Sequence, residues 1–204
     1  MDYYRVALKL IDLFQVKTVI DIGANQGTFG LSIAKSRNVD VYLVEPVREN
    51  VRNILRNIYI NRVQRCRVIP VAVADKRGKA LMYIRTLSDA KLLLSSKNNF
   101  NRLDNLSDVQ ITRVVSLEDL LKIVGESAGN ILIKIDCQGS ELSILSSAPQ
   151  SIKDKVRVII VEVHESLYGI QVTSIVKIME KLGFNLLFKI DYPFPRQPHL
   201  YFVG

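Results

Sequence analysis

The chain has 204 residues, of which 48% are hydrophobic and 24% charged, so it suits a single globular domain spanning 1–204 and excludes a disordered protein. Its formal net charge of +8 allows a nucleic-acid partner, but charge alone does not name one. No apolar run approaches the ~20 residues of a membrane span, and two cysteines without paired spacing argue against a disulfide scaffold, so we expect a cytoplasmic protein.

The first predicted element is a leading helix within residues 1–16. Its apolar positions on one stripe are Val6, Leu10, Leu13 and Phe14. Short β-branched runs then alternate with longer amphipathic stretches. We expect strands at 18–21, 39–44, 67–71, 131–135 and 156–163, and helices at 28–36, 48–59, 117–124, 141–147 and 172–182. Consecutive apolar positions suit strands buried on both faces, and the alternation predicts a mostly parallel, doubly wound α/β sheet.

Two regions depart from this alternation. Residues 79–84 and 109–115 read as additional short strands, and residues 86–108 between them are polar and without a clean period. A loop of that length in a compact domain is usually functional, so we expect it to cover the substrate as a lid. Near the end, 186–190 and 200–203 predict a closing antiparallel hairpin.

The first β-strand leads into a turn that carries two glycines. Gly23 and Gly27 lie between Asp21 and the expected helix, where a side chain would block a ligand or strain the turn. Their Gly-x-x-x-Gly spacing differs from that of dinucleotide folds. Glu45 ends the second strand, where a carboxylate can accept hydrogen bonds from both hydroxyls of a ribose. The pattern predicts a ribose-bearing ligand; the alternative is that Glu45 or Glu49 only complements a helix dipole.

Three segments, in this order, resemble the FkbM-type methyltransferases. The first is Asp-x-Gly-Ala-Asn-x-Gly-x-Phe, made by Asp21, Gly23, Ala24, Asn25, Gly27 and Phe29. The second is Val-Glu-Pro, which ends at Pro46, and the third runs from Ile133 to Glu141 and is similar to Leu-Lys-Ile-Asp-Val-Glu-Gly-Ala-Glu. Gln138 stands where the family usually has glutamate, so it keeps the hydrogen-bonding shape and loses the charge.

The resemblance implies a class I, Rossmann-like methyltransferase fold with an antiparallel C-terminal strand. It also implies S-adenosylmethionine as the methyl donor and, mostly, hydroxyl oxygens of small molecules or sugars as acceptors. The expected cofactor-binding residues are Asp21, Gly23, Ala24, Asn25, Gly27, Phe29, Glu45, Pro46, Ala72, Val73 and Asp136. In this arrangement the adenine lies near Pro46 and Ala72, and the methionine end faces Asp21 and Asp136.

Ligands of doubly wound sheets bind outside the carboxyl ends of the strands. We therefore expect Asp21, Glu45, Asp136 and the pair Glu162 and His164 to open into one crevice. An acceptor hydroxyl must lose a proton to a base, for which the catalytic candidates are Asp136, Glu162 and His164. Candidate substrate contacts are Lys134, Gln138 and Glu141.

Alternative interpretations of these residues remain open. Asp136 could pair structurally with Lys134, and His164 could bond a neighbouring loop backbone. A divalent metal held by Asp136, Glu162 and His164 is chemically compatible with these ligands. No spacing in the sequence compels that metal, so the sequence does not favour it.

Two other functions stay open. The positive charge allows an RNA methyltransferase, with Arg48, Arg52 and Arg56 either as a phosphate-binding stripe or as an ordinary solvated helix face. The chain could also be a non-catalytic S-adenosylmethionine-binding protein. No pattern predicts the identity of the acceptor or an oligomeric state.

Overall fold

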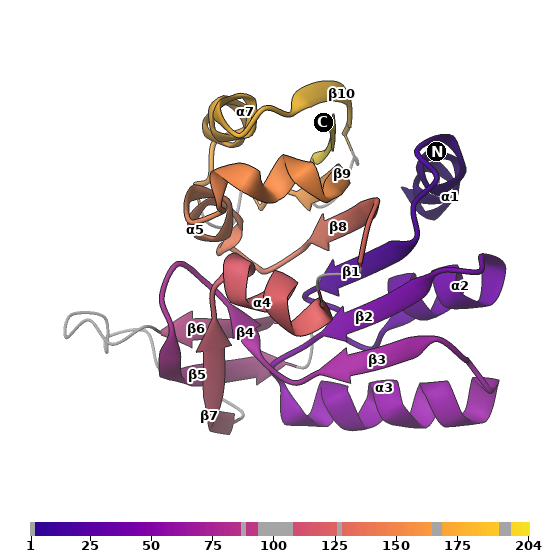
Figure 1. Cartoon of the computed structure of the whole chain (residues 1–204). Coiled ribbons are helices and arrows are strands. Elements are labelled where there is room, and N and C mark those ends of the chain that lie inside the picture. Colours follow the sequence, from indigo (N-terminus) through magenta and orange to yellow (C-terminus); the bar gives the residue numbers. More distant parts are fainter. Residues whose placement is uncertain (1–2, 87–88, 94–107, 126–127, 165–168, 192–196) are drawn as a thin grey trace.

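A seven-stranded sheet forms the centre of the computed structural model, which describes residues 3–86, 89–93, 108–125, 128–164, 169–191 and 197–204. Its strands are β1 (Thr18–Ile22), β2 (Asp40–Val44), β3 (Cys66–Ile69), β8 (Ile131–Ile135), β9 (Val156–Glu162), β10 (Asn185–Ile190) and β11 (His199–Val203). The order across the sheet is β10-β11-β9-β8-β1-β2-β3 (Figure 1). Strands β3, β2, β1, β8 and β9 are parallel, whereas β11 is antiparallel to both β9 and β10. The predicted parallel sheet with a closing antiparallel hairpin is confirmed.

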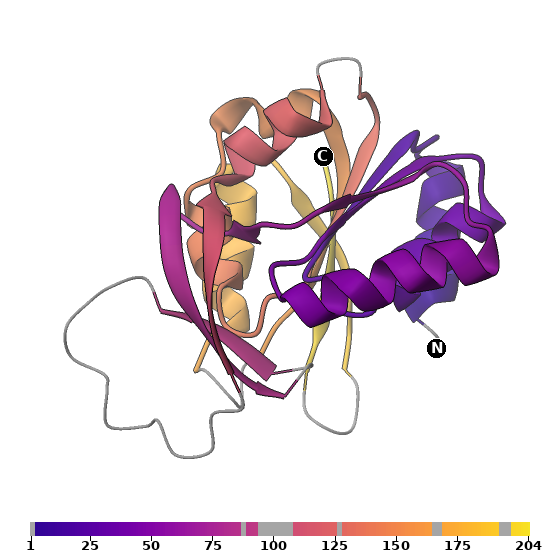
Figure 2. The same ribbon diagram turned by 90° about the horizontal axis from the view of Figure 1, so that it is seen from below.

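Helices cover both faces of this sheet. They are α1 (Tyr3–Leu13), α2 (Thr28–Ser36), α3 (Arg48–Asn61), α4 (Leu117–Val124), α5 (Glu141–Ser146) and α7 (Val172–Lys181), with a short 3-10 helix, η2 (Gln150–Asp154). Figure 2 shows α1, α2 and α3 on one side of the strands and α4, α5 and α7 on the other. Within the described part of the chain, no helix has the length and apolar character needed to cross a bilayer.

The two faces have separate cores because successive side chains of a strand point to opposite sides. In β1, Val19 packs into the core beneath α1, α2 and α3. Its neighbours Ile20 and Ile22 pack into the core beneath α4, α5 and α7. Both sets are at most 1% exposed, which explains the consecutive apolar residues in the strand.

Helix α1 buries a different stripe from the predicted one. Its buried positions are Val6, Ala7, Leu10 and Ile11, whereas Leu13 is 71% exposed. Because the buried face is centred between the 6–10 and 7–11 rows, the helical rotation turns position 13 to the rim. The prediction for Leu13 is therefore wrong, while Phe14 packs partly buried against the same core.

A second, four-stranded sheet lies beside the carboxyl ends of the main strands (Figure 1). Its strands are β4 (Ala72–Val73), β5 (Gly78–Thr86), β6 (Asp89–Leu93) and β7 (Asp108–Val115), in the order β4-β7-β5-β6. Strands β5 and β7 confirm the two additional strands. Strand β6 falls inside the expected 86–108 loop, so that prediction is wrong for the part that pairs antiparallel with β5 and satisfies its backbone groups. Residues 87–88 and 94–107 of the expected lid lie outside the described residues.

Candidate functional site

Two adjoining cavities lie at the carboxyl ends of β1, β2 and β8, and both are bordered by Gly23, Asn25 and Asp136. The first extends toward β2 and the second sheet. Its lining includes Glu45, Pro46, Ala72, Val73, Met82 and Gln138. The second extends toward α1 and α2. Its lining includes Tyr3, Ala24, Gln26, Thr28, Phe29 and Lys134. Two cavities therefore lie at the strand ends and share these three lining residues. Glu162 and His164, which we expected to open into the same crevice, line neither of them.

The turn after β1 is shaped by its glycines and held against β2. Gly23 has a φ of +80°, and a Cβ there would lie 1.8 Å from the backbone oxygen of Asp136, so only glycine lets β1 and β8 end side by side. The N–H groups of Gly23 and Ala24 both donate to the Val44 carbonyl, at 3.0 and 3.1 Å. Gly27, with a φ of +81°, precedes α2 without a side-chain cap and borders neither cavity.

Glu45 is a buried carboxylate at the wall of the first cavity. Its Oε2 accepts a hydrogen bond from the Asn25 N–H at 2.8 Å, and its Oε1 accepts from the Val47 N–H at 2.9 Å. Burial raises its pKa, although these N–H donors oppose the shift. Oε1 also accepts from Asn50 Nδ2 at 3.3 Å, so the room for a further hydrogen bond from a ligand's hydroxyl is on Oε2.

Asn25 supplies a second polar group to the same wall. Its Oδ1 is buried and has no hydrogen-bond partner among the described residues, and the residue borders both cavities. A buried unsatisfied acceptor is costly. This atom therefore calls for a donor from a bound molecule, and the lining fits a ligand that carries polar hydrogens.

Asp21 does not open into the crevice, so that prediction is wrong. Its side chain is fully buried; Oδ2 accepts from the Gly30 N–H at 3.1 Å, and Oδ1 lies 3.6 Å from Lys134 Nζ. The strand continues through Ile22, so alternation turns Asp21 toward α2. Burial works to lower the pKa of Lys134, but Asp136 and Asp21 outweigh it and the pKa is raised.

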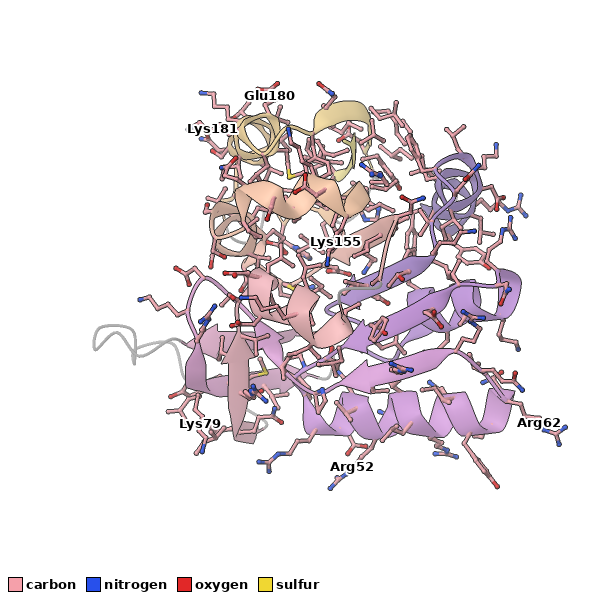
Figure 3. The ribbon with its side chains drawn as sticks, viewed as in Figure 1. Arg52, Arg62, Lys79, Lys155, Glu180 and Lys181 are labelled. Atoms are coloured by element: carbon pink, nitrogen blue, oxygen red, sulfur yellow. The ribbon has the colours of Figure 1, made fainter. Side chains whose placement is uncertain are left out.

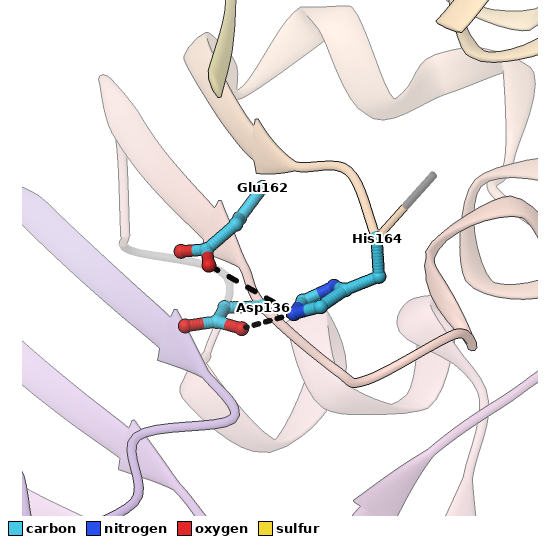
Figure 4. A group of neighbouring side chains, drawn as sticks. All are labelled: Asp136, Glu162 and His164. Carbon is cyan, nitrogen blue, oxygen red and sulfur yellow. Dashed lines mark ion pairs between the residues drawn. The ribbon is translucent and has the colours of Figure 1, made fainter. Parts of the chain in front are cut away.

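The three predicted catalytic residues come together where β8 and β9 end. His164 Nε2 lies 3.7 Å from Asp136 Oδ1 and 3.8 Å from Glu162 Oε1 (Figure 4). The other oxygen of each carboxylate has its own cationic or histidine partner. Lys134 Nζ lies 2.9 Å from Asp136 Oδ2, and His199 Nε2 lies 2.9 Å from Glu162 Oε2. The pairing of Asp136 with Lys134 is thus present together with the predicted site.

The His164 ring is held by two side chains, those of Glu141 and Gln138. It is fully buried, with Nδ1 2.8 Å from Glu141 Oε1 and Nε2 3.0 Å from Gln138 Nε2. Glu141 is fully buried too and accepts hydrogen bonds from the N–H groups of Cys137 and Gly139. Glu141 therefore borders neither cavity, contrary to the substrate contact we predicted.

The pKa values of the cluster are moved in opposite directions. Burial works to raise the pKa of Asp136, but the Lys134 ammonium outweighs it and the pKa is lowered. Burial works to lower the pKa of His164, but the hydrogen bond to the Glu141 carboxylate outweighs it and the pKa is raised. The cluster keeps a charged carboxylate beside an imidazole with increased proton affinity.

Two residues of the site escaped sequence reasoning. The Tyr3 ring stacks on Phe29 with centroids 5.6 Å apart and meets His199 edge-on at 5.4 Å. Burial raises the Tyr3 pKa. Tyr3 and His199 come from opposite ends of the chain and belong to no motif, so no local signal points to either of them.

Comparison with known proteins identifies the architecture. The methyltransferase FkbM domain matches residues 21–186. The chain belongs to the methyltransferase FkbM domain family. A search among proteins of curated function finds no match.

Three solved structures with similar folds are named as methyltransferases or methylases and share little sequence with this FkbM-family chain. A precorrin-6y C5,15-methyltransferase from Geobacter metallireducens GS-15 has a TM-score of 0.52 at 11% identity, covering 98% of this chain and 87% of that one. A ribosomal protein L11 methylase from Lactobacillus delbrueckii subsp. bulgaricus gives 0.53 at 13%, covering 97% and 76%. A magnesium protoporphyrin IX methyltransferase from Synechocystis PCC 6803, solved with bound SAM, gives 0.52 at 10%, covering 98% and 79%.

These likenesses confirm the class I, Rossmann-like methyltransferase fold. The family match makes this FkbM-family chain an S-adenosylmethionine-dependent methyltransferase, as predicted. The names of the three solved proteins point to very different acceptors, so the shared fold says nothing about the acceptor of this chain.

Proposed function

We propose that this methyltransferase transfers the methyl group of S-adenosylmethionine to a hydroxyl oxygen of a small molecule or glycan. S-adenosylmethionine as the methyl donor is supported by the anchored Glu45 carboxylate. This carboxylate borders the first cavity and can accept a further hydrogen bond from a ribose. The acceptor half is supported by the cluster of Asp136, Glu162 and His164, because an alcohol needs a partner for its proton.

The donor's adenosine fits the first cavity. Glu45 accepts a hydrogen bond from a ribose hydroxyl. The adenine lies among Pro46, Ala72 and Val73, which supply apolar surface from the β2 end and from β4. Asn25 Oδ1 accepts from a polar hydrogen of the ligand, which satisfies its buried oxygen.

The methionine end fits the second cavity. Thr28 begins α2 and borders this cavity. The N-cap residue, Gly27, offers no side-chain cap, and Asp21 holds the Gly30 N–H, so the N–H groups of the first two helical residues suit a carboxylate. Phe29 and Lys134 complete the wall, with Lys134 Nζ 5.5 Å from the Phe29 ring centroid. S-adenosylmethionine supplies a sulfonium-bound methyl group with a good leaving group.

Asp136 borders both cavities and thus marks where the donor's methyl group and the acceptor meet. Its Oδ2 is held by Lys134, so Oδ1 is the oxygen that orients an acceptor hydroxyl. The hydroxyl oxygen forms a bond to the methyl carbon as the carbon–sulfur bond breaks, and the hydroxyl proton passes to the cluster. Alignment of the two reactants supplies much of the rate, as it does in other in-line displacements.

Several basic side chains of the described residues project from different elements. Figure 3 shows Arg52 and Arg62 projecting beside α3, Lys79 on the second sheet and Lys181 on α7. The predicted stripe of Arg48, Arg52 and Arg56 is exposed on α3, and Arg52 pairs with Glu49 at 3.3 Å. This dispersion favours the solvated-face interpretation and a small acceptor over RNA.

The donor assignment is tested by calorimetric titration with S-adenosylhomocysteine. We expect saturable binding by the unchanged protein and roughly 10- to 100-fold weaker binding by Glu45→Gln, because the variant loses a charge-assisted hydrogen bond of about 1.5–3 kcal/mol. Glu49→Gln is the matched control, a nearby exposed glutamate whose loss leaves the affinity unchanged. Equal affinity in all three proteins would sink the assignment.

The acceptor assignment is tested by labelled methyl transfer into separated small-molecule, glycan and RNA fractions of a cell extract. We expect label in a small-molecule or glycan fraction, and its loss with Asp136→Asn while S-adenosylhomocysteine still binds. Label confined to RNA would establish the nucleic-acid alternative. Binding without transfer into any fraction would establish the non-catalytic one.

A further inference from the structure

We propose that Asp136, Glu162 and His164 form a binding site for a divalent cation, held by two carboxylate oxygens and one imidazole nitrogen. One ligand atom from each residue lies within 4.8 Å of the other two. Figure 4 shows the three side chains converging from the ends of β8 and β9. The sequence did not favour this site, because the spacing of the three residues does not show that their strands lie side by side in the sheet.

Each carboxylate has one oxygen committed and the other turned toward the same point. Asp136 Oδ2 pairs with Lys134 Nζ at 2.9 Å, which leaves Oδ1 facing His164 Nε2. Glu162 Oε2 pairs with His199 Nε2 at 2.9 Å, which leaves Oε1 facing the same nitrogen. The outer partners orient both ligands, as in protein metal centres where each ligand is itself hydrogen-bonded.

The orientation of His164 is the independent observation that points to a metal. Its Nδ1 lies 2.8 Å from Glu141 Oε1. A carboxylate can only accept, so Nδ1 carries a proton and the Nε2 lone pair is on the cluster side when the ring is neutral. There it accepts a hydrogen bond from Gln138 Nε2 at 3.0 Å, which a cation would replace. A histidine whose second nitrogen donates to a carboxylate is the usual arrangement at metal centres. Here that carboxylate is fully buried and fixed by the N–H groups of Cys137 and Gly139.

The local charge also calls for a cation. Three carboxylates, Asp136, Glu162 and Glu141, surround His164, and a single ammonium, that of Lys134, lies against Asp136. Burying carboxylates without full compensation is costly, and a divalent ion offsets that cost.

Gln138 is positioned to supply a further ligand to this site. Its Nε2 lies 3.0 Å from His164 Nε2, so half a turn of the amide would bring an oxygen ligand to the same point. The glutamine in place of the family's usual glutamate makes that ligand neutral. Two carboxylates then balance the charge of one divalent ion.

The distances suit a small cation with oxygen and imidazole ligands. Metal–ligand bonds of about 2.0–2.2 Å place neighbouring donor atoms roughly 3 Å apart. The separations of 3.7 and 3.8 Å from His164 Nε2 would have to close by less than 1 Å on binding; the two carboxylate oxygens, within 4.8 Å of each other, would close by less than about 2 Å. A donor set without thiolate suits Mn²⁺ or Mg²⁺ better than thiophilic ions, and it leaves positions for water and a hydroxyl.

The use of this site rests on the proposed O-methylation. Because Asp136 borders both cavities, a cation on Oδ1 lies beside the acceptor. It would hold the acceptor hydroxyl and lower its pKa. Because the three side chains of the cluster would then be ligands, the hydroxyl proton would pass to solvent instead of to the cluster. The bond changes remain those of methyl transfer, with no oxidation or reduction.

The test is a Mn²⁺ titration of the chelator-treated full chain, followed by the paramagnetic resonance signal of free Mn²⁺. We expect one bound ion per chain with a Kd below ~1 mM, displaced by Mg²⁺. Glu162→Gln removes a ligand, and Glu141→Gln removes the partner of Nδ1. Each should weaken binding by about 10- to 100-fold. Glu118→Gln is the matched control, a glutamate of the surface pairs with Arg77 and Lys122 whose loss leaves Mn²⁺ binding unchanged.

The unchanged protein alone can overturn the proposal. If the unchanged protein binds no Mn²⁺ up to several millimolar, the proposal is wrong, even if the Glu141 variant misfolds. An equal loss of Mn²⁺ affinity in Glu118→Gln would also contradict it. Circular dichroism of each variant separates misfolding from ligand loss. Titration of the same samples with S-adenosylhomocysteine keeps the proposals apart. Cofactor binding without Mn²⁺ overturns the metal site alone, and Mn²⁺ binding without cofactor overturns the donor assignment alone.

Discussion

Asp21 and Glu45 are acidic residues near the ends of neighbouring strands, and they take opposite roles. Asp21 precedes the last residue of β1 and faces α2, where it holds the Gly30 N–H. Glu45 follows the last residue of β2 and faces the first cavity. Asp21 pairs in register with Leu43, two positions before Glu45, so alternation alone would turn both side chains to the same side. The difference is the end of the strand: Asp21 lies within β1, whereas Glu45 lies beyond β2. The end of a strand must therefore be known to the residue before a carboxylate can be assigned to a site.

The Asp21 contact makes Gly30 a packing position. A Cβ there would lie 2.3 Å from Leu43 Cδ2 and 3.2 Å from Asp21 Oδ2. We expect Gly30→Ala to lower the free energy of unfolding by about 1–3 kcal/mol in urea denaturation, because the fully buried Leu43 has no room to move. Gly129→Ala is the control, since nothing lies within 4 Å of its Cβ position. Equal stability of both variants would contradict this account of α2 packing.

Helix α4 shows what local sequence decides about an element. It runs from Leu117 to Val124, as predicted, because Ser116 and Asp119 form a reciprocal capping box. Strand β6 shows the limit of local sequence. It exists because β5 offers an edge to pair with, and pairing between edges leaves no clear period in a segment of five residues.

The capping box carries a measurable share of stability. We expect Ser116→Ala to lower the free energy of unfolding by about 1 kcal/mol, because the Asp119 N–H loses its acceptor at 3.2 Å. Ser146→Ala, which removes an exposed hydroxyl bonded to Leu142 near the end of α5, should change stability by less than about 0.5 kcal/mol. Chemical denaturation of both variants makes the comparison, and similar losses would show that the cap contributes nothing special.

At the scale of the whole molecule, the second sheet is joined to the main one through shared cores. Val73 of β4 and Val115 of β7 belong to the core beneath α4, α5 and α7. Ala72 and Val114, their neighbours on the same two strands, pack with Val47 from the β2–α3 connection. Alternate residues of the same two strands thus bind the sheets together.

We therefore propose that residues 1–204 unfold as one domain. Scanning calorimetry should give a single transition whose calorimetric and van't Hoff enthalpies agree, since Val73 and Val115 of the second sheet belong to the same core as the main sheet. Two separable transitions, one lost on changing β5 alone, would show that the second sheet is an independent unit.

The sequence by itself determined the parallel sheet, most element bounds, the glycine turn and the family. These features depend on local periodicity, on helix caps and on short motifs, which can be recognised without knowing which distant residues are in contact. Only the tertiary structure decided that Asp21 is buried, that Glu141 holds His164, and that Tyr3 and His199 join the site. The physical reason is strand order. Placing β8 between β1 and β9 brings Asp136 to Glu162 and His164, and that neighbourhood depends on the whole sheet.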